Sequence, residues 1–274
     1  MCKVLKVSKS GYYYWCKGLI SNREKENKKL LQEILNIYNQ SNGTYGSPRI
    51  QEELYYRGYN VSRPRVARIM RCNNIQSKIR KKWVATTDSK HSNPIAPNLL
   101  NRNFIVGLPG MVWVSDITYI NTKNGWVYLT VVIDLFDRKV IGWALSTTMK
   151  AVETSMEALK MALSNRIRSE NLIFHSDRGV QYACSDFLKI INKNNITQSM
   201  SRKGNCWDNA VAESFFKTLK TESIYQYDFK SKREARREVF RYIEIWYNRK
   251  RRHSTLGYKT PLEIENLFNM NNAA

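Results

Sequence analysis

Residues 111–136 read MVWVSDITYINTKNGWVYLTVVIDLF, and this stretch decides the fold. Two runs rich in β-branched and aromatic residues flank the segment TKNG, whose Asn-Gly pair is typical of a tight hairpin. The run RKVIGWALST at 138–147 has the same strand-like composition and follows a turn at Asp137. The stretch therefore predicts three consecutive antiparallel strands.

The segments after the third strand alternate between helical and strand-like patterns. Periodic apolar residues predict helices at 151–165 and 184–195, and short apolar runs predict strands at 171–177 and 196–200. A glycine-containing loop, SRKGN, then leads into a helix that carries Glu213. This order predicts an α/β (α+β) fold with a mixed sheet that helices cover.

The N-terminal part of the chain has a helical pattern instead. Residues 23–40 place Leu30, Ile34, Ile37 and Tyr38 on one face of an amphipathic helix. Two shorter helices follow, one from Pro48 to a stop at Gly58 and one that Ser62 caps. Two short helices across a tight turn have the outline of a helix-turn-helix.

The second of these short helices would carry basic residues toward DNA. They recur at helical spacing in SRPRVARIMR and are Arg65, Arg68 and Arg71. An ordinary helical hairpin with a solvated basic face is the alternative.

Charge is the main feature of the composition. The chain has 274 residues, with 45 Lys and Arg against 23 Asp and Glu, and a net charge of +22. Residues 1–100 contain 19 basic and 6 acidic residues, residues 101–200 contain 11 and 8, and residues 201–274 contain 15 and 9. The basic ends indicate a polyanionic partner. Basic packaging proteins share such charge, but 7 Trp, 16 Tyr and 9 Phe indicate a packed core.

Cysteine usage and hydropathy exclude other classes. Five scattered cysteines without a CxxC pair, and three His, argue against a zinc finger or a disulfide framework and favour buried or inert thiols. The most apolar segment, WVYLTVVIDLF, is too short to span a membrane, and the N-terminus lacks the apolar run of a signal peptide. We therefore expect a cytoplasmic protein without a membrane partner.

Composition shifts predict the domain boundaries. We expect a helical region with the helix-turn-helix at 1–75, and a polar linker at 76–103 that Pro94 and Pro97 interrupt. The mixed-sheet domain would then span 104–225, and a basic helical C-terminal segment would span 226–274.

Three carboxylates have a placement that suggests chemistry. Asp116 lies in the middle of the first strand, Asp177 at the end of the fourth, and Glu213 on the helix after the fifth. If the first and fourth strands are neighbours, all three converge on one edge of the sheet. The alternative for Glu213 is a surface pair with Lys217, four residues on, which contributes about 0.2–0.5 kcal/mol.

The same residues carry a family resemblance. WVSDITYI, HSDRGVQY and SMSRKGNCWDNAVAESFFKTLKTE resemble the three catalytic blocks of insertion-sequence transposases, which share an Asp-Asp-Glu core with retroviral integrases. YGSPRIQEELYYRGYNVSRPRVARIMR resembles the helix-turn-helix segment of that family, and YIEIWYNRKRRHSTLGYKTPLE its C-terminal segment. The resemblance covers nearly the whole chain. It implies a ribonuclease H-like integrase core in the second-frame product, OrfB, of a two-frame element.

The resemblance also implies a mechanism. Asp116 would bridge two Mg²⁺ ions, for which Mn²⁺ can substitute, while Asp177 and Glu213 would each complete one ion. The enzyme would cleave the ends of its element and join the 3′ hydroxyl to another DNA phosphodiester. A nuclease that does not join, and a DNA-binding regulator, are the alternatives.

The implied partners are nucleic acid and other protein chains. The DNA partners would be the terminal inverted repeats of the element and a target DNA. We expect a homo-oligomer on DNA, a first-frame partner or fusion, and a bacterial cytoplasmic protein that associates with the nucleoid when bound to DNA.

Other residues are weaker candidates. Lys217 and Lys220 would contact DNA phosphates or form a solvated face. Asn209 would steady the carboxylate of Glu213, and Asp134 is either an outer carboxylate near the metals or a turn cap. His175 orients substrate or packs, and the role of His253 stays open. Backbone contacts to DNA are expected from the basic run Arg249, Arg251 and Arg252.

Overall fold

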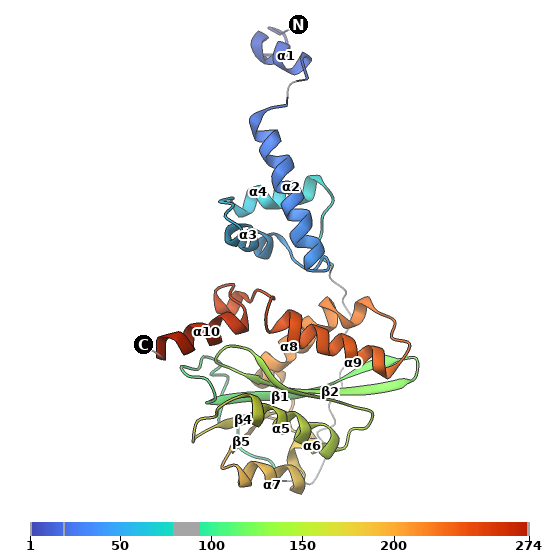
Figure 1. Ribbon diagram of the computed structural model, residues 1–274, viewed down its shortest axis with the longest axis vertical. Coiled ribbons are helices and arrows are strands. Elements are labelled where there is room, and N and C mark those ends of the chain that lie inside the picture. The colour runs from blue at the N-terminus through green and yellow to red at the C-terminus, as the bar shows by residue number, and fades with distance from the viewer. Residues whose placement is uncertain (1, 19, 79–93, 273–274) are drawn as a thin grey trace. The chain divides into compact units, whose positions relative to one another are not determined.

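The computed structural model describes residues 2–18, 20–78 and 94–272. The chain divides into two compact units, Met1–Lys78 and Ile79–Ala274 (Figure 1). Residues 79–93, which belong to the expected linker, lie outside the described residues. No helix in the described ranges is both long and apolar enough to cross a membrane.

The N-terminal unit is helical, as the sequence predicts. Its elements are α1 (Lys9–Cys16), α2 (Asn22–Gln40), α3 (Ser47–Tyr56) and α4 (Arg63–Cys72). Ser21 begins α2 with a capping box, because its hydroxyl accepts from Glu24 N at 3.2 Å and its own N–H donates to the Glu24 carboxylate at 2.8 Å. The apolar faces of α2, α3 and α4 form the core of this unit, with Leu30, Ile34, Ile37, Ile50, Leu54, Val66, Ile69 and Met70 buried.

The second unit is built on a five-stranded sheet in the order β3-β2-β1-β4-β5. Its strands are β1 (Val112–Thr122), β2 (Gly125–Asp134), β3 (Val140–Ser146), β4 (Ile173–Ser176) and β5 (Thr197–Met200). The first three pair antiparallel, while β4 pairs parallel with both β1 and β5. This mixed sheet confirms the predicted fold class.

The β1–β2 hairpin differs from the sequence prediction by one residue. Thr122 pairs with Gly125, so the two turn residues are Lys123 and Asn124 rather than the Asn-Gly pair itself. Gly125 has a φ of +95°, which suits glycine, and begins β2. The Thr122 hydroxyl donates to Gly125 O at 2.6 Å and accepts from Asn124 N at 3.2 Å, which closes the turn.

Helices cover both faces of the sheet (Figure 1). One face packs against α8 (Ala210–Glu222), α9 (Lys232–Phe240) and the π-helix η4 (Arg241–Tyr247), and its core includes Val114, Phe215 and Val239. The other face packs against α5 (Ser155–Asn165), α6 (Val180–Ala183) and α7 (Ser185–Lys193). The remaining short elements are η1 (Ala151–Glu153), η2 (Cys206–Asn209), η3 (Ile224–Gln226), η5 (Ser254–Leu256) and α10 (Pro261–Asn272).

Two expected boundaries need correction. Leu100 is buried in the core of the second unit and Leu99 N donates to Ser199 Oγ at 2.9 Å, so residues 94–103 are not a free linker. The expected C-terminal segment, 226–274, is not separate either, because Phe229, Val239 and Tyr247 lie in the same core as β1 and α8. The apolar positions Ala235, Val239, Tyr242 and Trp246 do indicate packing in the sequence, but their spacing does not show that the partner is the core of the sheet.

The contact between β3 and α5 requires a glycine. A Cβ on Gly142 would collide with the backbone of Ala158 and lie 2.7 Å from Ala162 N. We therefore expect Gly142→Ala to lower the free energy of unfolding by about 1–3 kcal/mol, the usual cost of overpacking. Denaturant unfolding measures this change. Gly107→Ala is the control, because nothing lies within 4 Å of that site; equal stability of the two variants would contradict the close packing.

Candidate active site

The parallel pairing of β1 with β4 brings the two predicted aspartates together. Val112 pairs with Ile173 and Val114 with His175, an offset of 61 residues (173 minus 112). Asp177 minus Asp116 is also 61, so the register carries Asp116 to the level of Asp177, which directly follows β4. Both aspartates are half-buried.

The third predicted carboxylate, Glu213, comes from a helix and not from a strand. It lies in the first turn of α8 and is exposed. Burial raises its pKa, and so does the nearby charge of Asp177. The pKa of Asp116 is raised well above its ordinary value by burial and then by Asp177, with a further contribution from Glu213. The three carboxylates therefore lie close enough to repel one another.

The carboxylates suit a divalent ion by their chemistry. Hard cations such as Mg²⁺ take oxygen ligands, and a cation offsets both the burial and the repulsion that raise the pKa values of Asp116 and Glu213. Two of the oxygens are already oriented, since Asp116 Oδ1 accepts from Ile117 N at 2.8 Å and Asp177 Oδ1 from Gly179 N at 2.9 Å. Within the described ranges, no three such side chains are gathered tightly enough to form a ready metal site. The three carboxylates are thus near one another without forming a closed set of ligands.

The two lysines of α8 differ in their surroundings. Lys217 is exposed, whereas Lys220 is half-buried with its ammonium 5.9 Å from the centre of the Tyr119 ring. Burial lowers the pKa of Lys220, and the negative charge of Asp116 opposes that change. Lys220 therefore lies beside the carboxylates, and contact of either lysine with DNA stays a prediction.

Asn209 has a different role from the one expected. Its Nδ2 donates at 3.0 Å to the main-chain oxygen of Ser115, which is the residue before Asp116. The amide therefore supports β1 rather than the Glu213 carboxylate. Its Oδ1 is buried without a hydrogen-bond partner in the part of the chain that the structure describes.

Asp134 is a buried turn residue. Its carboxylate accepts from Gly110 N at 2.8 Å and Phe136 N at 3.0 Å, and Arg166 lies 3.5 Å away. Burial, and then the charge of Asp137, raise the pKa of Asp134 to about 6. These contacts favour the turn cap over the outer metal carboxylate.

His175 is a buried packing residue. Its ring nitrogens lie 2.8 Å from Ser199 Oγ and 3.2 Å from Ser201 Oγ. Burial lowers the pKa of His175 to about 4, so the ring is neutral at physiological pH. The structure therefore favours packing over a direct role in orienting substrate.

The structure does not favour the expected DNA contacts of Arg251 and Arg252. Arg251 is buried and donates to both Glu222 oxygens at 2.8–3.0 Å. Arg252 is also buried and pairs with Glu263 at 2.9 Å. His253 packs edge-on against the Tyr247 ring, with centroids 4.7 Å apart. Only Arg249 of the three expected arginines is exposed.

The three arginines expected to contact DNA from the helix-turn-helix also differ in their exposure. Arg65 is half-buried and held against α2, where it donates to Asn27 Oδ1 at 3.0 Å and to Glu26 at 2.9 Å. It therefore does not point outward as expected. Arg68 and Arg71 are exposed on α4, so contact of these two with DNA stays a prediction.

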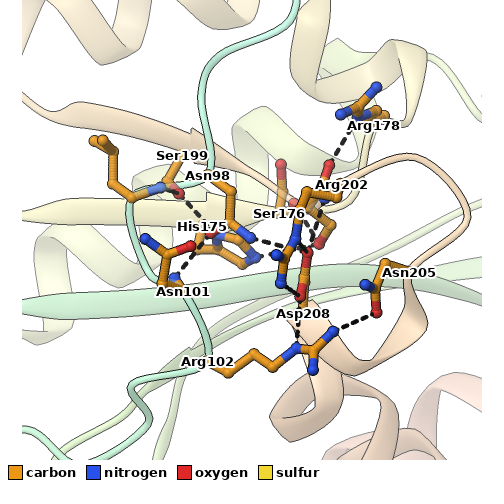
Figure 2. Close-up of polar contacts among 12 residues, drawn as sticks. Asn98, Asn101, Arg102, His175, Ser176, Arg178, Ser199, Arg202, Asn205 and Asp208 are labelled. Atoms are coloured by element: carbon orange, nitrogen blue, oxygen red, sulfur yellow. Dashed lines mark hydrogen bonds and ion pairs between the residues drawn. The ribbon is translucent and has the colours of Figure 1, made fainter.

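Sequence reasoning missed a polar cluster around Asp208. This aspartate is fully buried and accepts hydrogen bonds from Arg202, Arg102 and Asn98 (Figure 2). The available signal was one acid within the basic block SRKGNCWDN, although its partners at 98–102 are far away in sequence.

Comparison with protein families agrees with the topology. Profiles described as "Integrase core domain" match residues 108–206 and 194–261, and one described as "HTH-like domain" matches residues 25–83. The mixed sheet and these matches define a ribonuclease H-like integrase core that follows a helix-turn-helix region in the sequence.

Similar sequences then identify the family. The chain is 43% identical over 261 residues to "Insertion element IS600 uncharacterized 31 kDa protein" of Shigella sonnei, covering 95% of this chain and 96% of that one. It is 41% identical over 268 residues to "Transposase InsF for insertion sequence IS3A" of Escherichia coli, covering 97% and 93%. The chain therefore belongs to the family of insertion-sequence transposases with an integrase core. Its activity is that of a DNA transposase, a polynucleotidyl transferase.

Solved structures include more distant likenesses. A simian T-cell lymphotropic virus intasome chain has a TM-score of 0.48 at 17% identity, covering 84% of this chain and 73% of that one. The HTLV-2 integrase catalytic core domain, solved in complex with magnesium, has a TM-score of 0.45 at 17% identity, covering 57% and 97%.

The raised pKa of Asp116, caused by burial and then by the charge of Asp177, predicts a pH-dependent stability. Because its folded pKa lies above the unfolded value of about 4, ionisation of Asp116 costs stability as the pH rises through the folded pKa. We expect Asp116→Asn to raise the melting temperature of the metal-free protein at pH 8 and to leave it unchanged near pH 3, where both states are protonated. Thermal unfolding across this range tests the expectation. A gain of equal size at both values would rule out the electrostatic cause.

The basic run at 249–252 predicts two distinct phenotypes. Arg251→Gln leaves Glu222 buried without its cation, so we expect stability to fall by about 3–5 kcal/mol. Arg249→Gln should leave stability unchanged and make the slope of log DNA affinity against log salt shallower by about 0.9. Thermal unfolding and salt-titrated gel shifts separate the two. Unchanged DNA affinity in Arg249→Gln would remove Arg249 from the DNA contacts.

Proposed function

We propose that Asp116, Asp177 and Glu213 form the catalytic triad of this transposase. The register between β1 and β4, which sets Asp116 level with Asp177, is the observation that carries the proposal. Glu213 enters from α8 and shares the electrostatic coupling of the pair. The three side chains supply carboxylate oxygens and no protein nucleophile, which suits displacement at phosphorus by a water or a DNA hydroxyl.

The triad would hold two Mg²⁺ ions, with Mn²⁺ as a substitute. When bound, such ions activate the attacking oxygen and stabilise the leaving oxygen of an in-line displacement. The chain contributes the placement of the carboxylates: Ile117 N orients Asp116 and Gly179 N orients Asp177. Because α8 presents Glu213 at its exposed first turn, the third carboxylate can complete the site on the side that DNA approaches.

DNA would be held by cations of both units, most of them exposed. Arg68 and Arg71 of α4 would read or contact the terminal inverted repeats, while Lys217, Lys220 and Arg249 would contact the phosphates of the cleaved end and the target. Joining two ends to one target requires more than one active site, which favours a homo-oligomer on DNA. A first-frame partner or fusion, and a place in the bacterial cytoplasm at the nucleoid, belong to the same proposal.

The triad is tested by isosteric substitution. We expect Asp116→Asn, Asp177→Asn and Glu213→Gln each to abolish Mg²⁺-dependent cleavage and joining of end DNA, with DNA affinity nearly unchanged because the overall charge of the surface remains basic. Asp186→Asn is the matched control, since Asp186 is exposed and pairs with Lys189 on α7. A triad variant with wild-type joining would remove that residue from the site. Cleavage without joining by the wild type would favour the non-joining nuclease.

A further inference from the structure

The loop between β5 and α8, residues 201–209, touches every element that carries a triad carboxylate. At its first residue, Ser201 N donates to Ser176 O at 2.9 Å, and Arg178 Nε donates to Ser201 O at 2.7 Å. Ser176 and Arg178 flank Asp177 in the sequence. The start of the loop is thus bonded to both sides of the second triad residue.

The end of the loop contacts the other two carriers. Asn209 Nδ2 donates to Ser115 O at 3.0 Å, immediately before Asp116. The next residue, Ala210, begins the helix whose first turn carries Glu213. The loop therefore links β1, the end of β4 and α8, and it connects the helix that carries Glu213 to the two strands whose register places Asp116 beside Asp177.

Asp208 anchors this loop. Its Oδ2 accepts from Arg202 N at 3.0 Å, Arg202 Nε at 2.8 Å and Asn98 Nδ2 at 2.9 Å. Its Oδ1 accepts from Arg202 Nη2 at 2.7 Å and Arg102 Nε at 2.9 Å. These bonds close the loop upon itself across six residues and fasten it to residues 98–102 (Figure 2).

The anchor depends on the negative charge of a carboxylate. An asparagine has the same shape, but it accepts through one oxygen only and turns an NH₂ group toward two or three of these donors. A side chain with no exposed surface cannot replace the lost bonds with water. Replacement by Asn therefore releases the loop without leaving a large cavity.

We propose that Asp208 is a positioning residue for the transposase reaction, which holds the 201–209 loop in the conformation that keeps Asp116, Asp177 and Glu213 in register. This inference rests on the proposed triad. Asp208 itself bonds to residues of the loop and of the 98–102 segment, and its effect on the chemistry passes through the elements that the loop connects.

The test compares Asp208→Asn with Asp137→Asn. Asp137 is likewise fully buried and paired with an arginine, Arg166, but it lies in the turn after β2 and has no bond to the loop. Single-turnover joining at saturating DNA, DNA affinity and trypsin cleavage after Arg202 and Lys203 are measured at a temperature where both variants are folded. Both trypsin sites are exposed in the loop.

For Asp208→Asn we expect a loss of about 10²-fold in the joining rate at saturating DNA, because small misplacements of reacting groups have effects of this size. DNA affinity should stay within about threefold, since no exposed cation is removed. Trypsin cleavage in the loop should accelerate at least about tenfold. Asp137→Asn should show none of these changes. A wild-type joining rate with a rapidly cleaved loop, or an equal loss in Asp137→Asn, overturns the proposal.

A second variant guards against misfolding of the first. Arg202→Lys keeps the positive charge but loses the planar fork that bonds both oxygens of Asp208. We expect a slower joining rate at saturating DNA with an unchanged salt dependence of binding. If the loss appears only in DNA affinity, Arg202 is a phosphate contact and the positioning role is wrong. If Asp116→Asn joins DNA normally in the same assay, the triad proposal fails instead, while the trypsin result still reports on the anchor.

Discussion

The parallel register between β1 and β4 is the constraint on which the rest of the site depends. It sets two aspartates side by side at the point where the pairing ends, so like charges accumulate in a partly buried position. Hydrophobic packing on both faces of the sheet makes a shift of one residue costly, because such a shift turns every side chain to the other face. The carboxylates therefore cannot relieve their repulsion by sliding apart.

The sequence contains the local parts of this arrangement. Strand-like runs and helical periodicity predicted the five strands and the helices α5, α7 and α8, but not the short helix α6. The two aspartates are 61 residues apart, and the structure pairs β1 with β4 at that same offset. Periodicity reports which face of an element is apolar, and that is sufficient for elements whose core residues are close in sequence. The hairpin turn was placed one residue late, since Asn-Gly marks a turn without specifying which bond closes it.

Long-range polar pairs could not be predicted in the same way. Arg249 and Arg251 are the same residue type and lie two positions apart. Arg251 is nevertheless paired with Glu222, 29 residues away, whereas Arg249 is exposed to solvent. Asn98 and Arg102 likewise have the composition of a linker, although both bond to the buried Asp208. The sequence does not show whether a charged side chain is solvated or paired with a distant carboxylate. The net charge of this chain therefore overstates the number of cations that are available to DNA.

The support around the proposed triad suits the chemistry that we propose for it. Carboxylates that bind metal ions need their oxygens for the ions, so side chains that grasped those oxygens would compete with the reaction. In the 201–209 loop, the bonds from Ser201 and Asn209 end instead on the main-chain oxygens of Ser176 and Ser115, one residue before each aspartate. The buried carboxylate of Asp208, which anchors this loop, bonds to two arginines and an asparagine. Rigidity thus reaches the carboxylates through the backbone, which leaves their oxygens for the proposed metal ions.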